Sequence, residues 1–166
     1  MKQIFESENI RFVGVSEALV ADYLAMVNDM ERVERFIGGR HEPFTAEQEL
    51  RWVQKKREEK AVVFSMLEKA GCAFIGNIEL MDLTEAEAEL GIAITGDQQD
   101  RGFGTEAVSA VTRYGLERLG LKRIFLRTAP GNARAIHVYE KCGYREYDRT
   151  EEHVCMEFVP SPSPKG

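Results

Sequence analysis

The sequence predicts a single α+β domain organised around a mixed, mostly antiparallel sheet. With 166 residues, 43% of them hydrophobic and 30% charged, the chain has the size and composition of one globular domain with its own core. Three strand-like segments, at residues 61–68, 72–81 and 85–95, follow one another through short links. Short links join antiparallel neighbours. Amphipathic segments at 46–59 and 105–119 flank this meander and predict helices, which gives the α+β class.

The elements outside the meander are, in chain order, a strand at 10–15, a helix at 17–30, a helical turn at 31–36, a buried strand at 122–130, a helix at 132–141, and a hairpin of strands at 144–150 and 153–159. Thr45 and Gln48 form a capping-box pattern that begins the helix before the meander. Gly143 suits the end of the last helix. The end of the chain, 160–166, is rich in proline and serine, so we expect a disordered tail after a domain at 8–159.

Composition and charge exclude several classes of protein. The net charge of −6 argues against non-specific nucleic-acid binding, which needs a basic surface. The sequence contains neither an apolar run long enough to span a bilayer nor the apolar core of a signal peptide, so we expect a cytoplasmic protein without membrane contact. Cys72, Cys142 and Cys155 are widely spaced and form no CxxC pair, which predicts neither a disulfide framework nor a zinc site.

A glycine-rich segment, QQDRGFGTEA at 98–107, precedes a predicted helix and raises the question of a phosphate site. It lacks the Gly-Lys-Ser/Thr ending of a P-loop. Gly102, Gly104 and Ala107 satisfy the dinucleotide pattern G-x-G-x-x-A, but the required acidic residue is missing between 117 and 140 and the preceding strands are antiparallel. A simple tight turn remains open. The alternative is an anion site, because N–H groups at a helix start attract negative charge and Arg101 adds a positive one.

Two blocks of the sequence carry a family resemblance. Residues 99–104, QDRGFG, resemble the Q/R-x-x-G-x-G/A loop that binds the acyl-CoA pyrophosphate in the GCN5-related N-acetyltransferase (GNAT) family. Residues 132–144, NARAIHVYEKCGY, resemble that family's N-x-x-A-x-x-x-Y-x-K-x-G-F/Y segment. The blocks stand in the family's order, with one helix and one strand between them. The resemblance implies a GNAT fold, with helices on both faces of a sheet that is splayed between its fourth and fifth strands.

The resemblance also implies acetyl-CoA as co-substrate, with no metal. The residues it assigns to acetyl-CoA are Ile92, Ala93 and Ile94 beside the pantetheine arm, Gln99, Asp100, Arg101, Gly102, Phe103, Gly104 and Thr105 around the pyrophosphate, and Asn132 and Arg134 from the second block. An exposed surface position for Arg134 is an equal alternative.

The resemblance implies direct attack of an amine on the thioester. Tyr139 matches the family's tyrosine near the acetyl sulfur, where a phenol can donate a proton or a hydrogen bond to the leaving thiolate, which is general-acid work. A half-buried helix aromatic with a polar tip is the alternative. Family members use a Glu as base, often through water, or no dedicated base. Glu79 is the candidate base or amine anchor here, with Glu87 and Glu89 as alternatives that otherwise belong to a solvated strand face with Glu85. Cys142 as a covalent nucleophile is the rival mechanism, and we discount it because the motif places no His and acidic partner beside it.

The acceptor is left open. The overall pattern is nearest to the RimJ/RimL-like branch, and Glu79 stands in a strand similar to that of spermidine acetyltransferases. The final hairpin is shorter than is usual in the RimJ/RimL-like branch, so that branch does not identify the acceptor. We expect a primary amine, which could belong to a small molecule, a polyamine, a drug or a protein terminus. His41 lies in a loop that borders the acceptor site in this fold, and His137 is expected to pack or cap. A homodimer is compatible with the sequence, and a non-catalytic acyl-CoA-binding module is the alternative function.

Overall fold

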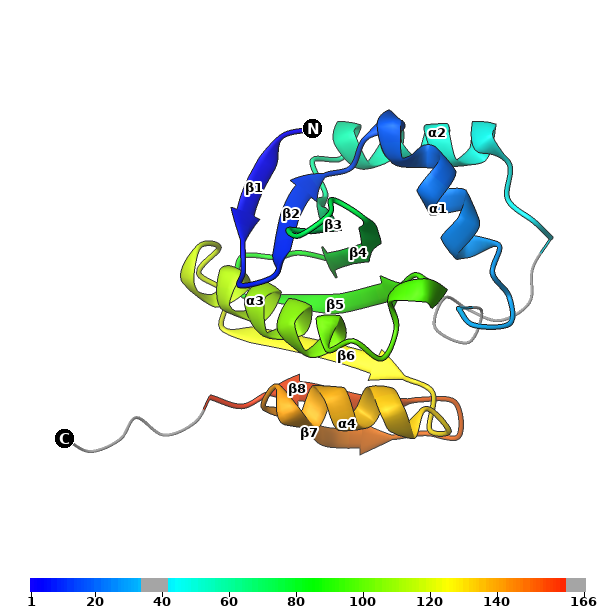
Figure 1. The fold of residues 1–166 in the computed structure, drawn as a ribbon. Helices are drawn as coiled ribbons and strands as arrows, with labels where there is room; N and C mark the ends of the chain where they lie inside the picture. The colour runs from blue at the N-terminus through cyan, green and yellow to red at the C-terminus, as the bar shows by residue number, and fades with distance from the viewer. Residues whose placement is uncertain (34–41, 161–166) are drawn as a thin grey trace.

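The structure is a computed structural model that describes residues 1–33 and 42–160. Its elements, in chain order, are β1 (Gln3–Glu6), β2 (Ile10–Gly14), the 3-10 helix η1 (Glu17–Leu19), α1 (Val20–Val27), α2 (Ala46–Glu58), β3 (Val62–Glu68), β4 (Phe74–Met81), β5 (Glu87–Ile94), the 3-10 helix η3 (Gly96–Gln98), α3 (Phe103–Glu117), β6 (Arg123–Thr128), α4 (Ala133–Lys141), β7 (Tyr144–Arg149) and β8 (Val154–Phe158). Figure 1 shows these elements around one continuous sheet.

The sheet has eight strands in the order β1-β2-β3-β4-β5-β6-β8-β7. Among the strands of the described residues, only β5 and β6 pair in parallel, and every other pair is antiparallel. This confirms the predicted α+β class and the mixed, mostly antiparallel sheet. The edge strand β1 lies before the predicted domain range of 8–159 and was not expected from the sequence. Phe5 from that strand stacks on Phe12 with ring centroids 4.3 Å apart, so β1 contributes to the core.

The sheet opens between β5 and β6, which are the fourth and fifth of the predicted strands. These two strands pair only over Glu87–Glu89 and Arg123–Phe125, although β5 continues to Ile94. Beyond Glu89 the backbone of β5 is therefore free on its β6 side. This confirms the predicted splay.

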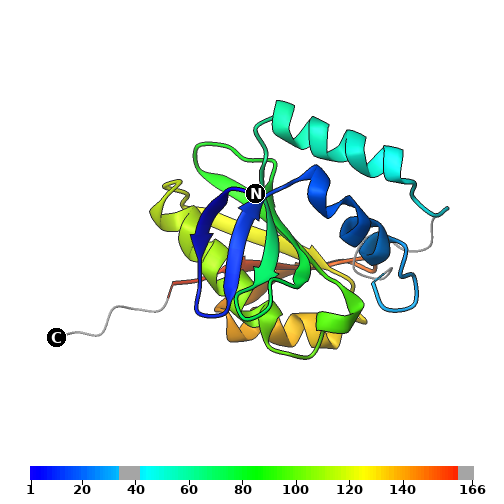
Figure 2. The same cartoon turned by 45° about the horizontal axis from the view of Figure 1, so that its top comes forward.

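Helices cover both faces of the sheet, as predicted, and each pair encloses a separate hydrophobic cluster. Helices α3 and α4 pack on one face over residues that include Ile78, Leu126 and Tyr144. Helices α1 and α2 pack on the opposite face over residues that include Val63 and Phe74. Figure 2 shows the two helix pairs on opposite sides of the sheet.

Several element boundaries differ from the sequence prediction. The expected helix at 17–30 is a 3-10 turn, η1, followed by a shorter α1 that ends at Val27. Helix α3 begins two residues earlier than expected because Gly102, at φ +85°, reverses the chain and serves as its N-cap. The predicted capping box of α2 is present, with Thr45 and Gln48 each accepting the other's backbone N–H. The predicted turn at 31–36 and the tail at 160–166 fall largely outside the described residues.

Candidate active site

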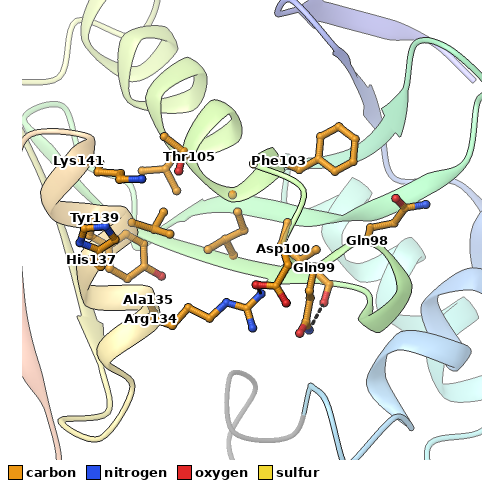
Figure 3. A pocket seen from close by; sticks show the side chains of 16 residues that line it. Gln98, Gln99, Asp100, Phe103, Thr105, Arg134, Ala135, His137, Tyr139 and Lys141 are labelled. Atoms are coloured by element: carbon orange, nitrogen blue, oxygen red, sulfur yellow. Dashed lines mark hydrogen bonds and ion pairs between the residues drawn. The ribbon is translucent and has the colours of Figure 1, made fainter.

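A pocket of about 360 Å³ opens between the start of α3, the outer face of α4 and the free end of β5. Figure 3 shows the side chains around it. The lining residues are Ile92, Ile94, Gln98, Gln99, Asp100, Gly102, Phe103, Gly104, Thr105, Val108, Arg134, Ala135, His137, Val138, Tyr139 and Lys141. The structure thus brings both sequence blocks to one site, although the side chains they contribute are only partly those expected.

The loop before α3 exposes unpaired backbone donors to the pocket. In the described part of the chain, the N–H groups of Phe103, Gly104 and Thr105 have no acceptor, and no side chain caps the helix. The first N–H groups of a helix have no partner within it and carry its positive partial charge, so they attract an anion. The side chain of Gln99 holds the loop in place by donating to the carbonyl of Ile94 at 3.0 Å.

The helix start leaves room for a ligand to approach the backbone. Gly102 has a left-handed φ of +85°, a conformation that suits glycine. A Cβ added to Gly104 would meet only Val138, at 3.8 Å, which is an ordinary contact. The protein itself therefore tolerates a small side chain at 104, and the space above this glycine belongs to the pocket.

Charged side chains of opposite sign line the pocket. Lys141 and Arg134 are cations on the pocket face of α4, and Asp100 is the one carboxylate among the lining residues. Arg134 forms an ion pair with Asp100 through its Nη2, and Figure 3 shows the two side chains meeting at the pocket. Lys141 forms no ion pair within the described residues. The net charge of the lining side chains favours an anionic ligand.

Arg101 does not lie where the sequence suggested. Its guanidinium pairs with Glu68 at the end of β3, at 2.9 Å, and covers the ring of Phe103. This position keeps the positive charge of Arg101 outside the pocket lining and makes it a support for the loop.

Tyr139 lines the pocket with a buried hydroxyl that has no hydrogen-bond partner in the described residues. Burial raises the pKa of this phenol to about 12, with a smaller contribution from Cys142. Its neighbour Tyr144 is also buried, yet its hydroxyl bonds to Thr112 at 2.7 Å. A buried polar group normally has a partner, so the unpaired hydroxyl of Tyr139 points to a ligand.

Several expected site residues lie elsewhere. Asn132 is only 6% exposed and caps α4 by accepting the N–H of Ala135. The side chain of Ala93 packs in the second hydrophobic cluster, although its backbone lies on the free edge of β5, where the pantetheine arm is expected. Glu79 also faces the side of this second cluster, where it pairs with Lys56 of α2 at 3.0 Å.

The glutamates of β5 do not form the solvated face expected from their alternation. Glu89 is 8% exposed and accepts two hydrogen bonds from Arg127, at 3.0 and 3.2 Å. Glu87 pairs with Arg123 at 3.0 Å. Both partners come from β6, so the pairing of β5 with β6 neutralises these carboxylates.

Cys142 has the properties of a packed thiol. Its Sγ lies 3.4 Å from the carbonyl oxygen of Thr105 and 3.4 Å from the hydroxyl of Ser109. Burial raises the pKa of the thiol, so it stays protonated near neutral pH. A packed, protonated thiol of this kind is a poor nucleophile.

Six lining residues were not assigned to the site from the sequence, namely Gln98, Val108, Ala135, His137, Val138 and Lys141. Lys141 stands in the second block but was given no role, and His137 was expected only to pack or cap. Arg134, Val138 and Lys141 are spaced i, i+4 and i+7, so the periodicity of one helix face was the signal that could have identified Lys141. His41 lies outside the described residues.

The described residues contain no helix suited to crossing a membrane by its length and apolar character. They also contain no group of three or more His, Cys, Asp or Glu side chains that could hold a metal ion. The pocket itself is lined by free backbone N–H groups, two cations, a phenol and apolar side chains, with Asp100 as its one carboxylate. Its donor set therefore suits an organic anion.

Comparison with known proteins gives one family. The family model of the acetyltransferase (GNAT) domain matches residues 9–145. A spermidine N(1)-acetyltransferase of Vibrio cholerae is 31% identical over 120 residues, which cover 70% of this chain and 67% of that protein. The spermidine N(1)-acetyltransferase of Escherichia coli K12 is 31% identical over 110 residues, covering 62% of this chain and 56% of that protein.

Solved structures agree in fold. A GNAT-family acetyltransferase from Bacillus anthracis has a TM-score of 0.80 at 20% identity, with 93% of this chain and 96% of that chain covered. A spermidine N-acetyltransferase from Vibrio cholerae, in complex with CoA and spermine, has a TM-score of 0.80 at 20% identity, with 92% and 96% covered. At this identity the likeness shows the shared fold.

The family match spans the elements that build the pocket, from β2 to the start of β7. The splayed sheet, the free N–H groups at the start of α3 and the resemblance of both sequence blocks agree with it. The chain belongs to the GNAT family of acetyltransferases and is thus an acyltransferase by its family.

Proposed function

We propose that this chain transfers an acetyl group from acetyl-CoA to a primary amine by direct attack of the amine on the thioester. The single observation that carries the proposal is the buried hydroxyl of Tyr139, which lines the pocket without a protein partner. This hydroxyl lines the same pocket as the free N–H groups of α3, so anion-binding groups and a proton donor share one ligand site.

The donor side of the pocket suits the phosphates of acetyl-CoA. The free N–H groups of Phe103, Gly104 and Thr105 would hold the pyrophosphate, and Arg134 and Lys141 would balance further negative charge. Ile92 and Ile94 supply an apolar wall along the free edge of β5, where the pantetheine arm would pair with backbone. A structural neighbour was solved with CoA bound, which supports this assignment.

The chemistry follows from the state of Tyr139. The amine nitrogen forms a bond to the carbonyl carbon, the carbon–sulfur bond of the resulting tetrahedral intermediate breaks, and the thiolate takes a proton. With its pKa raised to about 12, Tyr139 holds its proton at neutral pH and can deliver it to that sulfur. The amine must lose a proton as well, and Glu79 is the proposed base or amine anchor.

The acceptor is proposed as a primary amine, with polyamines tested first because the relatives are named spermidine acetyltransferases. The matched regions cover between 56% and 67% of the curated relatives described above, so this substrate is not transferred from them as a fact. Cytosolic location and a homodimer also stay predictions.

The test is acetyl transfer to an amine panel of spermidine, spermine, an amine-bearing drug and a peptide with a free N-terminus. Acetylated product is measured by mass spectrometry, because exposed Cys72 would interfere with thiol-reactive dyes. Binding of CoA is measured in parallel by calorimetry. Turnover of at least one amine supports the proposal. Binding of CoA without acetylation of any amine favours the non-catalytic binding module, and absence of CoA binding rejects both.

A further inference from the structure

The pocket contains a carboxylate at a position where the proposed function requires phosphate binding. Asp100 precedes the N-cap of α3 by two residues and lines the pocket beside the free amides. Negative charge at this place repels a phosphate group, and the same field that attracts phosphate also attracts the carboxylate. The presence of this carboxylate among groups that attract anions therefore needs a physical explanation.

Asp100 is paired with the very cation that a phosphate would need. Arg134 projects from the first turn of α4 and meets Asp100 at the pocket. The side chains are 49% and 76% exposed, so water reaches the ion pair and its net strength is modest. A weak, solvated pair of this kind opens readily when a more highly charged anion arrives.

We propose that Asp100 is a built-in competitor of the acetyl-CoA phosphates for Arg134. In the free protein Arg134 is held by Asp100; on binding, the guanidinium exchanges the carboxylate for a phosphate. The exchange lowers the affinity for acetyl-CoA and for the product CoA together, which speeds product release. The inference rests on the proposed function only in taking CoA as the ligand.

The backbone allows a substitution that removes only the charge. Asp100 has a left-handed φ of +64°, a conformation that Asn adopts as readily as Asp. Asp100→Asn therefore keeps the loop and the size of the side chain. Asp97→Asn is the matched control, because Asp97 is also exposed and ion-paired, to Arg32 at 2.8 Å, and does not line the pocket.

The experiment measures the Kd of CoA by calorimetry for the full chain and its variants at low salt and near 1 M salt. We expect Asp100→Asn to bind CoA about threefold to tenfold more tightly at low salt. Most of that gain should vanish near 1 M salt, where the Debye length falls to about 3 Å. Arg134→Gln should bind more weakly, and adding Asp100→Asn to it should give a smaller gain than in the wild type. Asp97→Asn should leave the Kd within about twofold.

The outcomes separate this inference from the proposed function. Unchanged or weaker CoA binding by Asp100→Asn, with wild-type binding intact, overturns the competitor role and leaves the acetyltransferase proposal standing. A gain that persists near 1 M salt also overturns it, since the effect would then be structural. Absence of CoA binding to the wild type instead rejects the proposed function.

Discussion

Replacing Tyr139 with Phe separates the chemical role of the hydroxyl from its role in packing. The hydroxyl is buried and has no hydrogen-bond partner in the described residues, so Tyr139→Phe breaks no bond in the protein. A buried hydroxyl without a partner lowers the free energy of unfolding by about 1–3 kcal/mol, and by less where water partly hydrates it from the pocket. Removing this hydroxyl should therefore leave the free energy of unfolding unchanged or raise it by up to about 1 kcal/mol. The proton donor is lost, and kcat should fall by roughly 10²- to 10⁴-fold.

Tyr144→Phe is the matched control, because both tyrosines are buried and their ring centroids lie 6.3 Å apart. The Tyr144 hydroxyl bonds to Thr112, so its removal should lower the free energy of unfolding by about 1 kcal/mol and leave kcat near the wild-type value. The assays are chemical denaturation for stability, calorimetry for CoA binding, and steady-state acetylation at saturating substrate for kcat. Wild-type kcat in Tyr139→Phe from pH 7 to 9 would refute the general-acid assignment.

Three further outcomes are expected. Gly104→Trp should raise the Kd of CoA at least about tenfold in calorimetry, because the indole fills pocket space. The circular dichroism spectrum should stay unchanged, because a Cβ at 104 meets no closer atom than Val138 at 3.8 Å. Arg101→Gln should change the Kd of CoA by less than about threefold, since Arg101 already pairs with Glu68. A loss of CoA affinity as large as that of Arg134→Gln would instead indicate that Arg101 contacts the ligand. Above pH 10 Tyr139 loses its proton in the unfolded chain, whereas the folded chain keeps that proton up to about pH 12. The free energy of unfolding therefore falls between these two pH values. Denaturation at pH 11 should show a smaller loss of this free energy in Tyr139→Phe than in the wild type.

The elements that build the donor pocket could be predicted because their signals are local. The glycine pair predicts the loop before α3, although the helix begins two residues earlier than expected, and α4 follows from one block of 13 consecutive residues, 132–144. The mainly antiparallel sheet follows from short links between strands. Each inference needs only residues close together in the chain.

The missed features depend on partners far away in the chain. Strand β1 has four residues, and its Phe5 packs on Phe12, Phe64 and Tyr114, which come from three other elements of the fold. The burial of Glu89 depends on Arg127, 38 positions later, and on the register of β5 with β6. Arg101 turns toward Glu68 for the same reason, since the end of β3 is brought beside the loop only by the fold.

The alternation along β5 explains how donor and acceptor chemistry would meet. Ile92 and Ile94 face the pocket under α3 and α4, whereas Ala93 faces the side that carries Glu79. In an intact sheet, backbone hydrogen bonds would separate the proposed base from the proposed acid, Tyr139. Pairing of β5 with β6 stops after Glu89, so no ladder hydrogen bonds close the gap between these two strands beyond that residue. Under the proposed function, an amine held on the Glu79 face would reach the thioester through this gap. The splay of the sheet would then be as necessary for catalysis as the free N–H groups at the start of α3.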